Sequence, residues 1–158
     1  MTNTTIITTN PVKRLITKIR YELPAKEAGG IILGRVLSKN NILIEEITLP
    51  TKFDERGYYF FKRDRKTAQN LINLRWQETN GKTIYLGEWH THNEISPIPS
   101  SRDLEMISNQ VKTSIMEIDF LLLFIIGMKR DYIAIQKKDS HTTINSINST
   151  FYRNIRMK

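Results

Sequence analysis

Cysteine is absent from this chain of 158 residues. Its absence excludes disulfides, thiol catalysis and any zinc site built on thiolate ligands. Long apolar runs are missing too: the longest covers residues 120–127, whereas a membrane-spanning helix needs about 18 apolar residues. The first ten residues lack the basic start and apolar core of a secretion signal. We therefore expect a cytoplasmic protein that does not enter a membrane.

Flexible linkers, internal repeats and low-complexity blocks are also missing. Hydrophobic residues make up 39% of the chain and charged residues 25%, which is ordinary usage for a globular protein. A chain of this length normally folds as one domain with a full hydrophobic core. We expect a single domain over residues 1–158.

Negative charge is the scarcer sign, because 24 Lys and Arg face 16 Asp and Glu, for a net charge of +8. Such an excess favours acidic partners but says nothing about the fold. The basic residues are dispersed along the chain and are not interleaved with aromatic residues, as a nucleic-acid-binding surface would require. The pattern favours a solvated basic surface, and we do not expect nucleic acid as the partner.

Hydrophobic periodicity predicts helices and strands that alternate along the chain. The helices are expected over 11–23, 65–79 and 101–114, and the strands over 29–37, 41–49, 58–61, 83–92, 120–126 and 132–136. The last twenty residues carry no clear pattern. This order predicts the α/β (α+β layered) class, with a mixed β-sheet flanked by helices.

Two of the three histidines, His90 and His92, are separated by one residue in the predicted strand 83–92. Residues i and i+2 of a strand point to the same face, with Cα atoms about 6.6–6.8 Å apart. Two imidazoles at that spacing can converge on one metal ion. By itself the pair is a weak signal for a metal site.

Asp103 strengthens the signal, because it falls in the first turn of the helix that follows the histidines. A tight loop can fold that carboxylate back over the end of the strand. Two histidines and one carboxylate leave the fourth position of a tetrahedral zinc site open, which is typical of catalytic sites. Ser100 and Asp103 also spell a capping box, so both residues have a purely structural interpretation as well.

These residues match the pattern His-x-His-x7-Ser-x-x-Asp without a gap. The sequence here resembles the JAMM/MPN metallopeptidase family, whose signature joins this string to an upstream glutamate. Glu27-Ala28-Gly29-Gly30 is similar to the family's upstream half, so the resemblance runs from Glu27 to Asp103. One departure is Asn93, where the family usually has proline, and we expect it to loosen the loop.

The resemblance implies a role for each matching residue. His90, His92 and Asp103 would hold one Zn2+ per chain. Glu27 would be the general base, and Ser100 would steady the tetrahedral oxyanion. It also implies a JAMM/MPN-like central sheet with cytidine-deaminase-like layering.

The segment 87–92, Gly-Glu-Trp-His-Thr-His, is similar to the small bacterial family members found in CBASS anti-phage operons, which remove a ubiquitin-like conjugate from the CD-NTase, a cyclic-oligonucleotide synthase. The resemblance implies a metallo-isopeptidase that hydrolyses the amide bond after the C-terminus of a ubiquitin-like modifier, or frees its CD-NTase conjugate, in antiviral defence. The modifier, its conjugate and a CD-NTase would be the partners.

Other functions stay open on sequence alone. One is a zinc peptidase that trims the C-terminal tail of a ubiquitin-like or sulfur-carrier precursor. Another is a basic nucleic-acid-binding module, or a metal-free scaffold, of related fold. The oligomeric state and the choice between linear and isopeptide bonds are not predicted.

Several conspicuous residues have ordinary interpretations. Trp89 alternates with His90 and is expected in the core, on the opposite face. The aromatic run 58–61 is expected as a core strand, and His141 as an ordinary surface histidine. Arg102 is expected either to balance local acid or to bind a carboxylate of the substrate.

Overall fold

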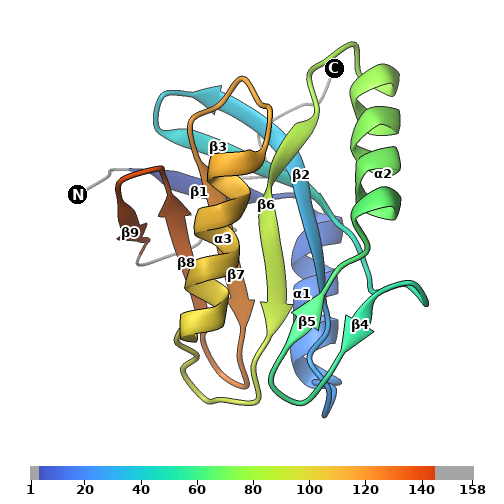
Figure 1. Cartoon of the computed structure of the whole chain (residues 1–158), viewed down its shortest axis with the longest axis vertical. Helices are drawn as coiled ribbons and strands as arrows, with labels where there is room; N and C mark the ends of the chain where they lie inside the picture. The colour runs from blue at the N-terminus through green and yellow to red at the C-terminus, as the bar shows by residue number, and fades with distance from the viewer. Residues whose placement is uncertain (1–3, 145–158) are drawn as a thin grey trace.

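A seven-stranded mixed sheet forms the centre of the computed structural model, which describes residues 4–144 (Figure 1). The strand order is β1-β3-β2-β6-β7-β8-β9. The pairs β1/β3 and β6/β7 are parallel and the other neighbours are antiparallel. The strands are β1 Thr5–Thr8, β2 Gly29–Ser38, β3 Asn41–Ile47, β6 Ile84–Thr91, β7 Leu121–Ile126, β8 Asp131–Gln136 and β9 His141–Thr143.

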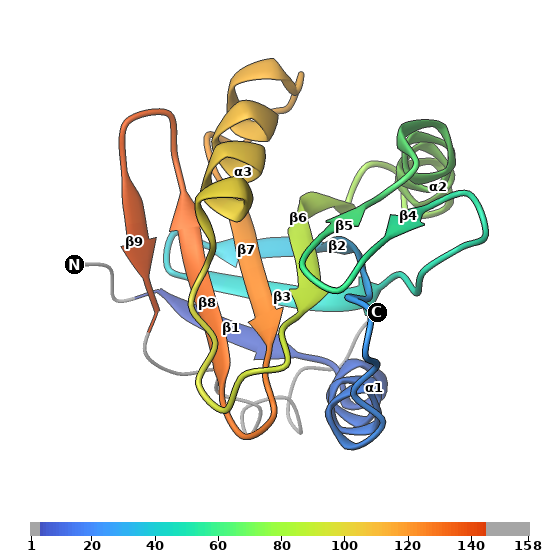
Figure 2. The ribbon, with the colours of Figure 1, turned by 60° about the horizontal axis from the view of Figure 1, so that its bottom comes forward.

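Three helices cover the two faces of this sheet (Figure 2). They are α1 Asn10–Tyr21, α2 Arg65–Glu78 and α3 Ser101–Thr113. Helix α1 packs its Val12 and Ile16 on one face, whereas α2 and α3 lie over the other and contribute Ala68, Ile107 and Val111. The predicted layered α/β class, with a mixed sheet between helices, is therefore confirmed.

A small two-stranded hairpin, β4 Glu55–Arg56 and β5 Phe61–Lys62, projects beside β6 (Figure 1). The prediction that 58–61 forms a buried strand is wrong for its first half: Tyr58 and Tyr59 are 65% and 89% exposed. They form the tip of the hairpin, where the chain reverses and no layer covers them. The aromatic run therefore contributes Phe61 alone to a strand.

Strand β6 changes its facing halfway along, at Gly87. Ile84, Leu86 and Trp89 pack with α1, whereas Tyr85 packs on the face of α2 and α3. The change comes from a β-bulge: Leu86 has no partner on β2, because Ile32 pairs with Gly87 and Leu33 with Tyr85. Gly87 has φ +151, and a Cβ there would lie 2.0 Å from the carbonyl oxygen of Leu122. The bulge thus sends Glu88 and His90 to the face of α3, and it confirms that Trp89 lies opposite His90, in the core.

The short strands β1 and β9 were not predicted. β1 is a four-residue strand in a polar segment, and β9 falls among the last twenty residues, which lacked a pattern.

The prediction of His141 as an ordinary surface residue is also wrong, because its ring nitrogens lie 2.7 Å from Tyr132 Oη and 2.6 Å from Gln136 Oε1. Within residues 4–144, no helix is both long and apolar enough to cross a bilayer.

Candidate metal centre

The two histidines lie at the end of β6, beside the start of α3. Thr91, between them, fastens this strand end to β2: its N–H donates to Ala28 O at 2.8 Å, and its Oγ1 accepts from Ala28 N–H at 3.0 Å. Glu27 directly precedes Ala28, so this pairing brings its carboxylate to the histidines. A contact that sequence alone could only infer from the family is thus produced by antiparallel pairing of β2 with β6.

The β4–β5 hairpin holds the backbone of Glu27 from the other side. The Glu27 N–H donates to Gly57 O at 2.8 Å, and Arg56 Nε donates to Glu27 O at 2.8 Å. Both backbone polar groups of Glu27 are therefore occupied by the hairpin. Its buried side chain is left to point toward the histidines.

The N-terminus of α3 places Asp103. Ser100 Oγ accepts from Asp103 N–H at 3.1 Å, and Asp103 Oδ2 accepts from Ser100 N–H at 2.9 Å. This reciprocal pair is the capping box predicted from the sequence. It fixes the rotamer of Asp103, so that Oδ2 also reaches the imidazoles.

The structure brings four of the five predicted side chains into direct proximity. Asp103 Oδ2 lies 3.3 Å from His90 Nε2 and 3.1 Å from His92 Nε2, and Glu27 Oε1 lies 3.5 Å from His92 Nε2. Glu27, His90 and His92 each offer a ligand atom, and these three atoms lie within 4.8 Å of one another. Ser100 joins the group through its cap on Asp103.

Charge and burial shift the pKa values of the two carboxylates, Glu27 and Asp103, in opposite directions. Burial raises the pKa of Glu27, and the charges of His90 and His92 only partly oppose that rise. Burial would raise the pKa of Asp103 too, but the adjacent imidazoles of His90 and His92 hold that pKa well below its usual range. Asp103 is therefore an anion at neutral pH, whereas Glu27 is the carboxylate that binds a proton more readily.

The donor set fits a zinc ion. Two ligands at about 2.0–2.1 Å from a tetrahedral zinc are themselves about 3.3–3.4 Å apart, close to the 3.3 and 3.1 Å that separate Asp103 Oδ2 from the two imidazole nitrogens. Among the described residues, His90 Nε2 and Glu27 Oε2 are buried without a hydrogen-bond partner. Buried polar atoms are rarely left so, and both belong to this cluster.

Two supporting contacts were not predicted. Glu94 Oε1 lies 2.8 Å from His92 Nδ1, and a carboxylate on the far ring nitrogen commonly orients a metal-binding histidine. Asn93, expected to loosen the loop, instead ties it down, since its Nδ2 donates to Pro24 O at 3.1 Å and Ala25 O at 3.3 Å. That tether joins the histidine strand to the segment before Glu27.

Comparison with known protein families agrees with this geometry. Residues 10–143 match the family described as prokaryotic homologs of the JAB domain. The chain belongs to this family. The resemblance to JAMM/MPN proteins found in the sequence is therefore confirmed, and the match includes every residue of the candidate metal centre.

Three similar proteins bear the name CD-NTase/cGAS isopeptidase. The Pseudomonas aeruginosa protein is 43% identical over 49% of this chain and 48% of its own length. The Escherichia coli protein is 29% identical over 83% and 81%, and the Vibrio cholerae protein 26% identical over 91% and 89%. In fold, this chain is similar to a Desulfitobacterium hafniense protein solved in solution, with a TM-score of 0.58, 18% identity and coverage of 96% and 99%.

Proposed function

We propose that this chain is a zinc-dependent isopeptidase of bacterial anti-phage defence. Its substrate would be the amide bond that follows the carboxy terminus of a ubiquitin-like modifier, or the conjugate of that modifier with a CD-NTase. The observation that carries the proposal is the convergence of Glu27, His90, His92 and Asp103. The name shared by the three relatives supports the choice of substrate.

His90, His92 and Asp103 would hold one zinc ion per chain. Asp103 Oδ2 lies at similar distances from both imidazoles, 3.3 and 3.1 Å, whereas Glu27 lies closest to His92, at 3.5 Å, and further from His90, within 4.8 Å. This asymmetry supports Asp103 as the ligand and leaves Glu27 for proton transfer. When bound, zinc would supply a Lewis acid that polarises the scissile carbonyl and lowers the pKa of water to about 7.

Glu27 would be the general base. Its Oε2 has no hydrogen-bond partner in the described structure, and burial raises its pKa. A carboxylate with a raised pKa takes a proton from the attacking water more effectively, and then donates it to the departing amine nitrogen. The hairpin contacts on its backbone would hold Glu27 in place through both transfers.

Ser100 would stabilise the oxyanion of the tetrahedral intermediate. Its Oγ accepts from Asp103 N–H, and that contact leaves the hydroxyl proton free to be donated elsewhere. A hydroxyl can make both bonds at once. The cap and the oxyanion role are thus compatible in one side chain.

The experiment that tests this function combines elemental analysis with hydrolysis. Purified chain should contain close to one zinc and should release the modifier from a CD-NTase conjugate until a chelator is added. Glu27→Gln should keep its zinc and lose activity by about 10² to 10⁴, the usual contribution of a positioned base. His92→Ala should lose zinc and activity together.

Three outcomes would contradict the proposal: a wild-type chain that binds no zinc, a conjugate that stays intact, or near wild-type turnover by Glu27→Gln. If a sulfur-carrier precursor is trimmed and the conjugate is not, the alternative substrate predicted from the sequence replaces this one. In that case the assignment of zinc ligands and base would stand.

A further inference from the structure

A cleft leads away from the candidate metal centre along β6. Its first part, with a volume of about 410 Å³, begins at His90 and Asp103 and runs between β5 and α3. A second part of about 500 Å³ lies between α2 and the segment after α3, with Trp76 and Ile115 on its wall. Arg63 lines both parts, so it stands where they meet.

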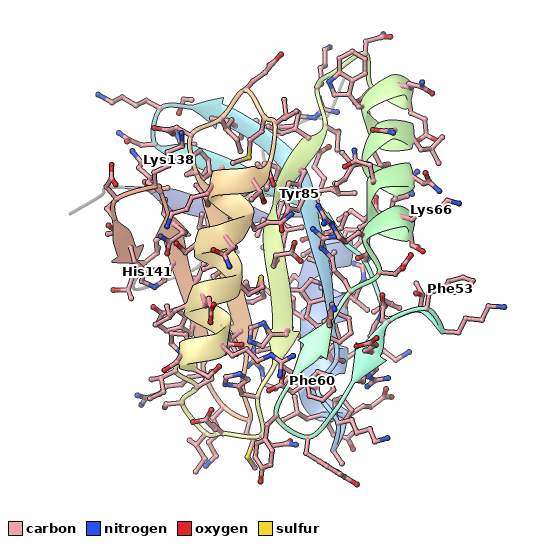
Figure 3. The ribbon with its side chains drawn as sticks, in the orientation of Figure 1. Phe53, Phe60, Lys66, Tyr85, Lys138 and His141 are labelled. Atoms are coloured by element: carbon pink, nitrogen blue, oxygen red, sulfur yellow. The ribbon has the colours of Figure 1, made fainter. Side chains whose placement is uncertain are left out.

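The Arg63 side chain is held by the carboxylate of Glu88. Arg63 Nε donates to both carboxylate oxygens of Glu88, at 2.7 and 3.0 Å. Tyr85 Oη donates to the same carboxylate, and the Arg63 guanidinium carbon lies 5.9 Å from the centre of the Tyr85 ring. Figure 3 labels Tyr85, which lies between β6 and α2. The Arg63 and Glu88 side chains are only 16% and 7% exposed, so this is a fixed pair and not a flexible surface contact.

The buried ion pair of Arg63 and Glu88 is not explained by its contribution to stability alone. Removing two charges from water costs several kcal/mol per ion, and a buried pair often repays no more than an apolar pair of similar volume. The Glu88 carboxylate is matched by Arg63 Nε, whereas the four N–H donors on the two Nη nitrogens are not used in that contact. They are what Arg63 can offer to the clefts that it lines.

The first part of the cleft is also positively charged beyond this pair. Lys62, Arg65 and Arg102 line it as well. Arg102 lies over the ring of Phe60, with its guanidinium carbon 4.8 Å from the ring centre, and Phe60 is labelled beside β5 in Figure 3. The acidic residues of the wall are Glu88, which Arg63 neutralises, and Asp103 at the metal centre. An occupant of this cleft therefore meets cationic donors.

We infer that Arg63 and Arg102 select an acidic side chain in the extended tail of the substrate, about two or three residues from the scissile bond. The inference rests on the proposed isopeptidase function and adds a specificity rule to it. Glu88 lies two residues before His90 on the same face of β6, about 6.6–6.8 Å away, and an extended peptide advances about 3.2–3.4 Å per residue. Glu88 acts here as a positioning residue, because it holds the guanidinium that contacts the substrate.

The binding test uses the Glu27→Gln chain, so that cleavage is slow during the measurement. Labelled tail peptides carry one glutamate that moves position by position, on both sides of the scissile bond, through a sequence of alanine and glycine. A matched series carries glutamine. Fluorescence anisotropy should show that glutamate binds about tenfold tighter than glutamine at one position, two or three residues from the bond, because a charge-assisted hydrogen bond replaces a neutral one.

Variants then identify the side chains responsible. Arg63→Gln and Arg102→Gln should each bring the ratio of the affinities for the glutamate and glutamine peptides down toward one. Arg102→Glu should instead favour a peptide with lysine at the same position. Arg63→Lys keeps the charge but loses the fork that can bind a carboxylate with two hydrogen bonds, so it should retain only part of the preference. Glu88→Gln should weaken the preference while Arg63 is intact, as a positioning role requires.

Arg35→Gln is the matched control, because Arg35 also pairs through Nε with a shielded carboxylate, that of Glu45, at 2.9 Å. It lies on β2, outside both parts of the cleft, and it should keep the full preference. If Arg63→Gln fails to fold, the exposed Arg102 still decides the question through its two variants.

Equal binding of the glutamate and glutamine series at every position would overturn the inference, as would a preference that survives Arg63→Gln and Arg102→Gln alike. Neither result would touch the proposed function, which is measured separately by zinc content and by cleavage of the conjugate. Conversely, a chain that cleaves no conjugate but retains the binding preference would overturn the function and not the selectivity of the cleft.

Discussion

At the scale of single residues, the same atoms of Ser100 and Asp103 cap helix α3 and build the candidate metal centre. The hydrogen bonds that begin α3 are the same ones that orient Asp103 toward His90 and His92. A cap is normally worth about 1 kcal/mol of stability. Here it also sets the position of a proposed metal ligand, so fold and chemistry share one contact.

Ser100→Ala separates the two tasks. If Ser100 stabilises the oxyanion, its loss should lower turnover by about 10² to 10³ and also cost about 1 kcal/mol of stability through the lost cap. Zinc content should stay near one per chain, since Ser100 is not a ligand. Steady-state kinetics, denaturant unfolding and elemental analysis measure the three quantities. A loss of stability with turnover unchanged would leave Ser100 as a cap only.

At the scale of elements, β6 positions the site because its facing changes at a bulge. Without the bulge at Leu86, strict alternation from Tyr85 would send Glu88 and His90 to the opposite face of the sheet, toward α1. Sequence periodicity predicted the strand 83–92 but not its bulge, because alternation alone does not show where an extra residue enters.

Gly87→Ala should therefore destabilise the chain strongly. A Cβ would lie 2.0 Å from Leu122 O at a φ of +151, so either the bulge or the pairing of β6 with β7 must give way. We expect a loss of at least about 2 kcal/mol in denaturant unfolding, together with weaker zinc binding. Gly81→Ala is the control: Gly81 also has a positive φ, of 81, but its nearest contact would be a Trp76 ring atom at 3.2 Å. Similar losses in the two variants would show that the bulge has no special role.

Strand β9 carries a further titratable residue, His141, away from the candidate metal centre. Burial lowers the pKa of His141, whose ring lies stacked near Tyr132 and contacts Gln136. In the unfolded chain this histidine has a pKa of about 6.5. The unfolded state thus binds its proton first as the pH falls, and stability contributed by neutral His141 is present above about pH 6.5 and lost below it.

His141→Asn should reduce that dependence. Unfolding free energies at pH 7.5 and pH 5.5 should fall further on acidification for the wild-type chain than for the variant. The comparison between the two chains isolates His141, because His90 and His92 are present in both. An identical loss in both chains would show that His141 does not contribute.

At the scale of the whole molecule, the sequence predicted the helices and the layered sheet, and its motif named the five residues for which we propose roles in the site. Those features rest on local signals: periodicity, caps and a motif of fixed spacing. What it missed depends on tertiary contacts, such as the hairpin that holds Glu27, the tether from Asn93 and the pair of Arg63 with Glu88. β1 was not predicted, because four residues in a polar segment give no usable periodicity.

The candidate metal centre lies where distant parts of the chain meet, so the proposed zinc ion would make global stability depend on its binding. Glu27 precedes β2, the histidines end β6 and Asp103 begins α3, so an ion bound there joins three elements. A ligand that binds only the folded chain stabilises it by about 2.7 kcal/mol at one hundred times its dissociation constant. For a chain of this size, each kcal/mol moves the thermal midpoint by about 2–4 °C. Zinc-loaded protein should therefore melt about 5–11 °C above chelated protein.

Glu27→Gln should keep that difference, because Glu27 is proposed as the base, whereas His92→Ala should lose it. Calorimetry of the three chains with and without chelator measures the effect, and a difference that disappears in Glu27→Gln would make Glu27 a ligand in its own right.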